Sequence, residues 1–279
     1  MTDQSQIAAT GTAQTTLSFT SLKGGGRTAK LLLNRPDQAN AFSAQMMDEI
    51  SAHVATLKAQ NDVRVLVVTG SGKHFSAGAD LGWMQASAKL SFAENMRDAE
   101  RLRSMFEALA NLEIPKIAAI RGAVYGGAVG LVACCDFAVA DSAAKFCLSE
   151  AKLGLLPAVI APYLLRKMKM GQLRRLALSA TVFTSSDAKD FGLIELICAN
   201  QGDDDLELAV NTEINALLAC GPEAQKSILR LFESLRSKGN PQGEDTVEAI
   251  SKARTGAEGQ AGLGSFFSKV APPWSRSLS

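Results

Sequence analysis

Residues 63–69 read VRVLVVT, and this run most narrowly limits how the chain can fold. It is mostly β-branched and apolar, which favours a β-strand. An apolar run without polar alternation is typical of a strand covered on both faces, as in the interior of a mostly parallel sheet. Because such a sheet needs helices on each side, the run predicts an α/β architecture.

Strand and helix patterns alternate along the chain until about residue 200. Other strands are predicted at 28–34, 115–120, 137–140 and 195–198. The spacing of apolar residues and capping residues predicts helices after Ser43, at 92–112, at 128–135, at 171–179, and from Thr184 to Gly192.

From Leu206 the pattern is helical, with breaks at 221–222 and 239–243. We therefore predict three parts along the chain: a disordered N-terminus at 1–15, an α/β core at 16–205 and a helical C-terminal domain at 206–279.

Composition excludes several classes of protein. The net charge of +1, without a dense Lys/Arg cluster, gives no electrostatic basis for binding nucleic acid. No stretch approaches 18 uninterrupted apolar residues, so no membrane span is expected, and residues 1–16 lack the pattern of a secretory signal. Five cysteines without a CxxC pair, and only two histidines, indicate a cytoplasmic protein with reduced thiols and no metal site.

Two glycine-rich loops follow predicted strands and carry the first hint of chemistry. They read HFSAGADL at 74–81 and YGGAVGLVACCD at 125–136. A loop that leaves a strand and opens a helix has unpaired backbone N–H groups. Two such loops on adjacent strands would aim two donors at one oxygen, which is an oxyanion hole built from main chain.

Each loop taken alone also fits ordinary turn chemistry, and that alternative stays open here. Three other interpretations fail. Gly126, Gly127 and Gly130 lack the order of a dinucleotide-binding turn, and residues 70–74 lack the first glycine of a P-loop. A nucleophilic Ser76 or Ser149 would have no G-x-S-x-G elbow around it.

One carboxylate stands in a mostly apolar segment, KFCLSEAKLGLLPAVIAPYLL at 145–165. A buried carboxylate is costly unless it is paired or has a task. On local sequence alone, Glu150 either faces solvent or pairs with Lys152, or it acts as an acid or base in a pocket.

Several ordered stretches resemble the crotonase family of enoyl-CoA hydratases and isomerases. They are LLLNRPDQANAFS, VRVLVVTGSGKHFSAGADL, IPKIAAIRGAVYGGAVGLVACCDFAVADSAAKF, SEAKLGLLPAVIAPYL and TGAEGQAGLGSFFSKVAPPW. The resemblance implies a spiral of ββα turns followed by a helical domain used in trimerisation, with two trimers commonly stacked as a hexamer. It also implies an acyl-CoA thioester substrate and no cofactor, since coenzyme A is part of the substrate.

The resemblance also assigns roles by position. Ala79 and Gly127 would donate the two oxyanion-hole N–H groups, and Glu150 would be the acid/base. The residues expected to contact coenzyme A are Gln38, Ala39, Ala77, Ala79, Asp80, Leu81, Gly82, Phe266 and Lys269. For the last two, the resemblance also allows contact with the site of a neighbouring subunit.

Three positions depart from the family pattern. Gly130 stands where two-glutamate hydratases carry their first Glu, Gly82 stands where a CoA-contacting Lys is common, and LPAVIAPYL replaces a PGxGG run. With one carboxylate, Glu150 would protonate the α-carbon and orient the water through its other oxygen. We expect burial among Phe146, Leu148 and Leu155 to raise its pKa.

The stretches GGAVGLVACCD, SEAKLGLLPAVIAPYL and SAGADLGWMQ look like bacterial hydratases of branched glutaconyl-CoA thioesters. Those proteins act on 3-methylglutaconyl-CoA in leucine degradation or isohexenylglutaconyl-CoA in acyclic terpene degradation. Gly130 would then make room at the carbon that water attacks. The candidate cations for the distal carboxylate of such a substrate are Lys89, Arg97 and Arg101.

Other functions remain open at this point. A Δ3,Δ2-enoyl-CoA isomerase and a general enoyl-CoA hydratase would also work with one Glu. A non-catalytic acyl-CoA-binding or RNA-binding scaffold is the remaining class. Retention of both loops and Glu150 argues against such a scaffold, and the nearly neutral charge argues against RNA.

Overall fold

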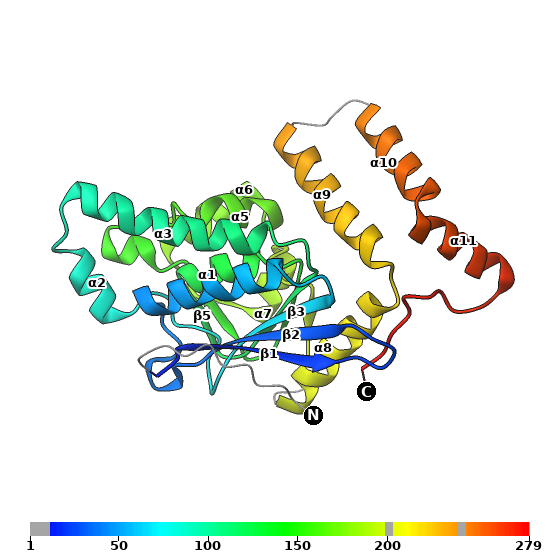
Figure 1. The fold of residues 1–279 in the computed structure, drawn as a ribbon. Coiled ribbons are helices and arrows are strands. Elements are labelled where there is room, and N and C mark those ends of the chain that lie inside the picture. The colour runs from blue at the N-terminus through cyan, green and yellow to red at the C-terminus, as the bar shows by residue number, and fades with distance from the viewer. Residues whose placement is uncertain (1–11, 199–202, 239–243, 279) are drawn as a thin grey trace.

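A six-stranded sheet forms the centre of the molecule in the computed structural model, which describes residues 12–198, 203–238 and 244–278 (Figure 1). Its strand order is β1-β2-β3-β4-β6-β9. The strands are β1 (Thr15–Ser21), β2 (Arg27–Leu33), β3 (Val63–Gly70), β4 (Lys116–Ile120), β6 (Phe137–Ala140) and β9 (Leu196–Ile197). Only β1 and β2 pair antiparallel, and each later pair is parallel.

Strand β3 is buried along its whole length, as its apolar run predicts. Successive side chains of a strand point to opposite faces. Leu66 and Val68 accordingly belong to the core under α1 (Ala44–Lys58) and α3 (Phe92–Ala110), whereas Val65 and Val67 belong to a second core under α8 (Asp203–Leu218). The predicted α/β architecture, with a sheet covered on both sides, is confirmed.

A smaller sheet of three strands lies beside the first: β5 (Ala123–Tyr125), β7 (Lys145–Cys147) and β8 (Phe183–Thr184). Strand β4 leads into β5 and then α4 (Gly127–Ala133). Strand β6 leads into β7, the short 3-10 helix η2 (Glu150–Leu153) and α5 (Ala161–Lys167). Each turn therefore adds one strand to each sheet and then a helix, which is the expected ββα spiral.

Several predicted boundaries are confirmed within one or two residues. Ser43 caps α1 by accepting a hydrogen bond from the Met46 N–H at 3.1 Å. Thr184 and Asp187 form a capping box at α7 (Ser185–Asp190), which ends just before Gly192. The remaining core helices are α2 (Leu81–Ser87) and α6 (Met170–Ser179). The sequence prediction missed β1, part of which it had assigned to a disordered N-terminus.

The helical C-terminal region divides into two parts. Helix α8 packs on β3, β4 and β6 and so completes the core. Helices α9 (Pro222–Lys238), α10 (Glu244–Thr255) and α11 (Ala257–Ser268) pack on one another and project away from the sheet (Figure 1). The predicted break at 221–222 falls at the start of α9. The predicted disorder at 1–11 and the break at 239–243 lie outside the described residues.

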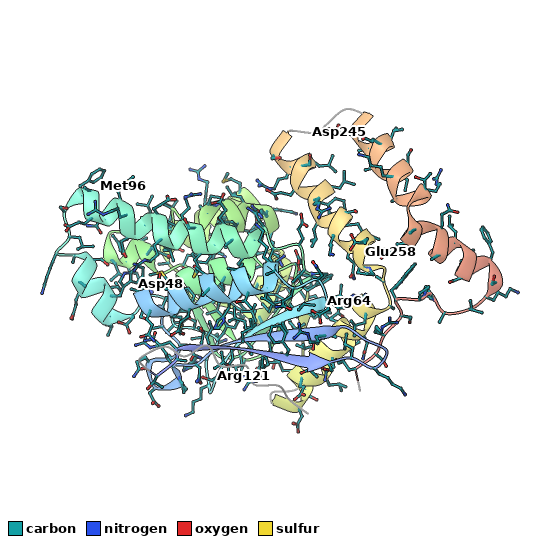
Figure 2. All side chains as sticks on the ribbon, in the orientation of Figure 1. Asp48, Arg64, Met96, Arg121, Asp245 and Glu258 are labelled. Carbon is teal, nitrogen blue, oxygen red and sulfur yellow. The ribbon has the colours of Figure 1, made fainter. Side chains whose placement is uncertain are left out.

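Polar contacts join the projecting helices to the core (Figure 2). Arg64, on β3, donates to the carbonyl oxygens of Cys220 at 2.8 Å and Trp274 at 3.2 Å. Glu258, on α11, accepts from the backbone N–H groups of Glu223 and Ala224 at the start of α9. A carboxylate at a helix N-terminus is favourable, so Glu258 fixes α11 against α9. No helix within the described ranges is long and apolar enough to cross a membrane.

Candidate active site

Glu150 is the first residue of η2, close behind β7, and its carboxyl group is half-buried. Its Oε2 atom is shielded from solvent and has no hydrogen-bond partner in the described part of the chain. Burial removes water from the charged form and raises the pKa of Glu150 above its ordinary value. The predicted direction of the shift is therefore confirmed.

Two details of the sequence interpretation of Glu150 change. Phe146 and Leu148 are buried near it as expected, but Leu155 is 57% exposed and contributes no burial. The reason is that the chain leaves η2 through Gly154 and runs along the surface. Lys152 is also exposed, and no ion pair joins it to Glu150 in the ranges that the structure describes. The structure therefore does not support the alternative in which Glu150 faces solvent or pairs with Lys152.

The carboxyl group of Glu150 faces the start of α4. Gly126 precedes this helix with a φ of +52°, a conformation that side chains rarely tolerate. A Cβ at Gly126 would lie 3.5 Å from Glu150 Oε1 and 3.5 Å from Ser149 Oγ. The Gly126 N–H donates to the carbonyl oxygen of Cys147 at 2.9 Å, which ties the end of β5 to the end of β7.

The two predicted N–H donors lie on neighbouring loops beside this carboxyl group. Gly127 is the first residue of α4, where an N–H has no partner within the helix. Ala79 follows Gly78, whose Cβ position would be only 2.7 Å from the carbonyl oxygen of Tyr125. Neither the Ala79 N–H nor the Gly127 N–H has an acceptor among the residues described. Two free donors side by side can hold one substrate oxygen.

Phe42 joins the two loops, and the sequence analysis did not single it out. Its N–H donates to the Gly78 carbonyl at 2.7 Å, and its own carbonyl accepts from Asp80 at 2.9 Å. Its buried ring reaches within 3.4 Å of the Cβ position of Gly127. One residue thereby sets the spacing of both donor loops. The available signal was an apolar residue just before the Ser43 cap.

The turn predicted to help bind coenzyme A lies against the first donor loop. The Ala77 N–H donates to the Ala39 carbonyl at 2.9 Å, and Gln38 is the exposed residue before it. Asn40 is fully buried, and its amide donates to the carbonyls of Ser71 and His74. Asn40 therefore holds the turn in place and does not face a ligand.

Asp80, Leu81 and Gly82 form the start of α2. Asp80 accepts from the Trp83 N–H at 3.0 Å and pairs with Arg35 at 2.9 Å. Although partial burial opposes ionisation, these two donors hold the pKa of Asp80 below its ordinary value. Leu81 is 76% exposed beside it. Of the residues predicted to contact coenzyme A in this segment, Ala79, Leu81 and Gly82 are exposed, and Ala77 and Asp80 are partly buried.

Phe266 and Lys269 do not join this site within the chain. They lie at the end of α11, which packs on α9 and α10, and Figure 1 shows that helix at the far end of the molecule from α2. Phe266 is also largely exposed. If these residues contact the substrate, they must reach the site of another copy.

The space beside Gly130 is occupied, which corrects the steric part of the sequence interpretation. A Cβ at Gly130 would lie 2.6 Å from the Cβ of Ile160 and closer still to its Cγ2 atom. Ile160 precedes α5 and is 3% exposed. Gly130 therefore makes room for Ile160 and does not open a space for a branched acyl chain.

The three candidate cations are all exposed in the chain. Arg101 is paired with Asp48 at 3.3 Å across α3 and α1. Lys89 and Arg97 form no salt bridge with any residue that the structure describes. Arg97 and Lys89 are thus better placed than Arg101 to meet an added carboxylate.

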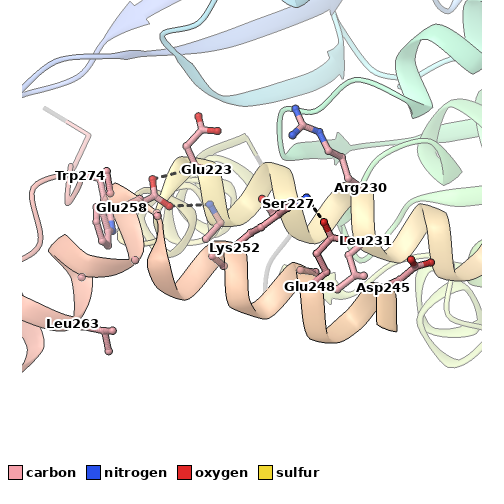
Figure 3. Close-up of a pocket in the computed structure, with 18 of the residues that line it drawn as sticks. Glu223, Ser227, Arg230, Leu231, Asp245, Glu248, Lys252, Glu258, Leu263 and Trp274 are labelled. Atoms are coloured by element: carbon pink, nitrogen blue, oxygen red, sulfur yellow. Dashed lines mark hydrogen bonds and ion pairs between the residues drawn. The ribbon is translucent and has the colours of Figure 1, made fainter. Parts of the chain in front are cut away.

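A groove of about 840 Å³ lies elsewhere, between α9 and the helices α10 and α11 (Figure 3). Arg230, Glu248 and Lys252 line it, with Trp274 at one end. None of the residues assigned to catalysis or to coenzyme A lies in this lining. The groove belongs to the projecting helices and not to the site around Glu150.

Comparisons with known proteins agree on one family. The model of the family described as enoyl-CoA hydratase/isomerase matches residues 25–277. The structure of an enoyl-CoA hydratase from Shewanella pealeana is 38% identical, and the match covers 92% of this chain and 95% of that one with a TM-score of 0.85.

Two curated relatives carry different activities in their names. A probable enoyl-CoA hydratase from Mycobacterium leprae is 34% identical over 77% of this chain and 83% of its own length. A peroxisomal Δ3,5-Δ2,4-dienoyl-CoA isomerase from Arabidopsis thaliana is 32% identical over 80% of this chain and 83% of its own length.

Proposed function

Because this chain belongs to the enoyl-CoA hydratase/isomerase family and is an enzyme acting on CoA thioesters, we propose that it hydrates the 2,3-double bond of a branched glutaconyl-CoA. The observation that carries hydration is the half-buried carboxyl of Glu150, whose pKa is raised, beside two free N–H donors. A protonated carboxyl can give its proton to carbon, and the donors can hold the enolate oxygen that forms.

The proposed reaction balances with Glu150 alone. The Ala79 and Gly127 N–H groups bind the thioester oxygen and withdraw electron density from C3. Water attacks C3 while one oxygen of the Glu150 carboxyl gives its proton to C2. The other oxygen takes a proton from the water, so Glu150 ends protonated, as it began. Burial raises the pKa of Glu150 and so favours the protonated carboxyl, the form in which this cycle begins and ends.

Support for a branched glutaconyl thioester comes from the three sequence stretches around the donor loops and Glu150. The exposed cations Arg97 and Lys89 offer a second reason, since this substrate carries a distal carboxylate. The 3-methylglutaconyl and isohexenylglutaconyl thioesters are both consistent with these features. They would place the enzyme in leucine or in acyclic terpene degradation, respectively.

Isomerisation is the second candidate. A single carboxylate can move a proton between two carbons without any water, and one relative in the comparison is named as a dienoyl-CoA isomerase. A general enoyl-CoA hydratase differs from the main proposal only in the acyl chain that it accepts.

Substrates of four kinds separate these functions. Purified enzyme would be incubated with 3-methylglutaconyl-CoA, isohexenylglutaconyl-CoA, crotonyl-CoA and 3-hexenoyl-CoA. Loss of the conjugated enoyl-thioester absorbance indicates hydration, whereas its gain from 3-hexenoyl-CoA indicates isomerisation. The proposal expects the highest kcat/KM with a branched glutaconyl thioester, and a preference for crotonyl-CoA would contradict the substrate assignment.

Glu150→Gln tests the chemistry in the same assay. This nearly isosteric change removes the transferable proton, so we expect kcat to fall about 10²- to 10⁴-fold while CoA esters still bind. Full activity in this variant would reject the mechanism. Binding measured by calorimetry with a saturated acyl-CoA separates loss of chemistry from loss of the site.

We further propose that the enzyme is a homotrimer or a hexamer of two trimers. Helices α10 and α11 and the residues after them expose many large apolar side chains, namely Val247, Ile250, Leu263, Phe266, Phe267 and Val270. Exposed apolar surface of this extent on projecting helices favours association. The groove of Figure 3 is open on the same helices.

A further inference from the structure

The hydroxyl group of Ser149 has no structural task that the fold explains. Ser149 is the N-cap residue of η2, and a serine at such a position normally accepts a hydrogen bond from an N–H two or three residues later. The Ser149 side chain makes no such bond. Its oxygen has no hydrogen-bond partner within the described residues, and the residue is only partly buried.

The oxygen of Ser149 instead faces the same small space as the carboxyl of Glu150. Ser149 Oγ and Glu150 Oε1 are each 3.5 Å from the position that a Cβ would take at Gly126. Because Gly126 has no side chain, none stands between these two oxygens, and both face the same side of that residue.

This space adjoins the place where the thioester would be held. Gly127 follows Gly126 directly, and its N–H is one of the two free donors. A thioester oxygen bound to that N–H brings C2 and C3 of the acyl chain next to Gly126. The two polar groups of residues 149 and 150 therefore meet the substrate from one side.

We propose that the Ser149 hydroxyl binds the attacking water together with Glu150, which deepens the hydratase function proposed above and rests on it. The water gives one proton to a Glu150 oxygen and donates its second O–H to Ser149 Oγ. Its lone pair is then aimed at C3. Ser149 keeps its own proton throughout and forms no covalent bond, so it is a water-binding group and not a nucleophile.

The hydroxyl supplies a partner that one carboxylate cannot provide. Glu150 has to give a proton to C2 and receive one from water, which leaves it no free oxygen to fix the other O–H of the water. An unfixed water reaches the productive orientation less often. Since Ile160 fills the space beside Gly130, no second carboxylate can enter from α4 to perform this task.

Two reactions of the enzyme separate the role of Ser149 from that of Glu150. Hydration requires a bound water. Exchange of the α-protons of a saturated acyl-CoA with D₂O requires the donor loops and Glu150 but adds no water to the substrate. For Ser149→Ala we expect hydration kcat to fall about 10- to 100-fold, the loss of one well-placed hydrogen bond, with exchange within about twofold of the unmodified enzyme.

Matched variants complete the experiment. Glu150→Gln should lose both reactions. Ser179→Ala removes an exposed hydroxyl that bonds only to its own helix and to Thr181, and should change neither. Ser149→Cys keeps the size of the side chain with a weaker hydrogen-bonding group and should give an intermediate hydration rate even if Ser149→Ala folds poorly.

Three results would overturn the inference. Unchanged hydration in Ser149→Ala would show that the hydroxyl does not bind the reacting water. An equal loss of hydration and exchange would show that Ser149 merely holds Glu150 in place. If the unmodified enzyme exchanges α-protons but hydrates no enoyl thioester, the hydratase function fails and the role of Ser149 fails with it, which distinguishes that case from the first two.

Discussion

At the scale of single residues, burial of the Glu150 carboxyl group favours its proposed role as an acid but costs stability. Its Oε2 atom is buried and has no hydrogen-bond partner among the residues that the structure describes, and loss of solvent raises its pKa. Folding therefore favours the protonated form of this group. Any stability that depends on the protonation of Glu150 must change with pH, and the sign follows from the direction of the shift.

The folded protein holds the Glu150 proton to a higher pH than the unfolded chain does. Stability is consequently unaffected below the unfolded pKa of about 4.3 and falls as pH rises through the folded pKa. Gln does not titrate, so Glu150→Gln should become more stable than the parent as pH increases from 4 to 8. Thermal unfolding of both proteins across that range measures the difference. A difference in Tm that stays constant with pH would show that Glu150 is not destabilised by burial.

Gly130 and Ile160 form a second pair whose coupling can be measured. Gly130→Ala places a methyl group against Ile160, so we expect overpacking to cost about 1–3 kcal/mol. Ile160→Ala alone should cost about 2–5 kcal/mol by leaving a cavity. The double variant removes the closest contact, the one with the Cγ2 atom of Ile160, and leaves only the contact with the Cβ at position 160, which can relax into the cavity. The total cost should therefore be smaller than the sum by about 0.5–3 kcal/mol.

Urea unfolding of the four proteins tests this coupling. Gly171→Ala in α6 is the matched control because a Cβ there meets no atom within 4 Å. That change should leave stability equal or slightly improved, since Ala is a better helix former than Gly. Strictly additive costs at 130 and 160 would contradict the contact between them.

The sequence could indicate Glu150 because a lone carboxylate in an apolar run is unusual in itself. It could not indicate Ile160 or Phe42, because each of these acts through a neighbour far away in sequence. Ile160 meets Gly130, and Phe42 meets both Gly78 and Gly127. The prediction that Leu155 helps to bury Glu150 was wrong for a related reason: apolar character alone does not determine whether a loop residue packs against the core.

At the scale of elements, the donor loops depend on how closely the segment 76–80 approaches β5. Gly78 has a φ of +93°, and its Cβ position lies 2.7 Å from the Tyr125 carbonyl oxygen. Any side chain there must push the two strands' loops apart. The Ala79 N–H would then move away from the Gly127 N–H, and the pair would no longer share one oxygen.

Gly78→Ala should therefore lower hydration kcat about 10²-fold, the typical effect of misplacing a catalytic group by about 1 Å. Gly25→Ala is the matched control. Gly25 also has a positive φ, +102°, but its Cβ position meets no atom within 4 Å. Both variants carry backbone strain of about 1–3 kcal/mol, and Gly78→Ala should lose further stability through its contact with the Tyr125 carbonyl, so its Tm should fall more than that of Gly25→Ala. Equal kcat values in the two variants would contradict the role of the close approach.

Long, strongly patterned elements were predictable, whereas short and half-polar ones were not. Strand β3 can be recognised from its uninterrupted apolar run, and helix α1 from its regularly spaced apolar residues. Strand β1 alternates polar residues with partly buried Leu17 and Phe19 at the sheet edge, and its pattern is correspondingly weak. Strands β5, β7 and β8 have only two or three residues each, and they exist because the second sheet assembles them.

At the scale of the whole molecule, the function of the projecting helices α9, α10 and α11 has to be explained. Arg64 joins this region to the core through hydrogen bonds to the carbonyls of Cys220 and Trp274, and Glu258 fixes α11 against α9, so the direction of these helices is part of the fold. Their exposed apolar side chains face no part of their own chain's site. Sequence resemblance assigned Phe266 and Lys269 to the coenzyme A site, and the single chain leaves both remote from it (Figure 1).

The exposed apolar side chains and the remote position of Phe266 and Lys269 are both explained if the end of α11 completes the site of an adjacent subunit in the proposed trimer. The prediction is complementation between two damaged chains. One carries Glu150→Gln, and the other carries Phe266→Ala with Lys269→Gln. Each should be nearly inactive as a pure oligomer, because every site lacks either the acid or the contacts to coenzyme A.

A mixed oligomer, purified through two different tags after co-expression, should regain activity. A site that takes its core from the second chain and its α11 from the first is intact, and every mixed cyclic trimer has one such site among its three, which is about a third of the sites in the doubly tagged species. Mass measured by light scattering confirms that the mixed species assembles. If α11 served its own chain, every site would remain damaged and mixing would restore nothing. Recovery near one third therefore assigns the α11 residues to a neighbouring site.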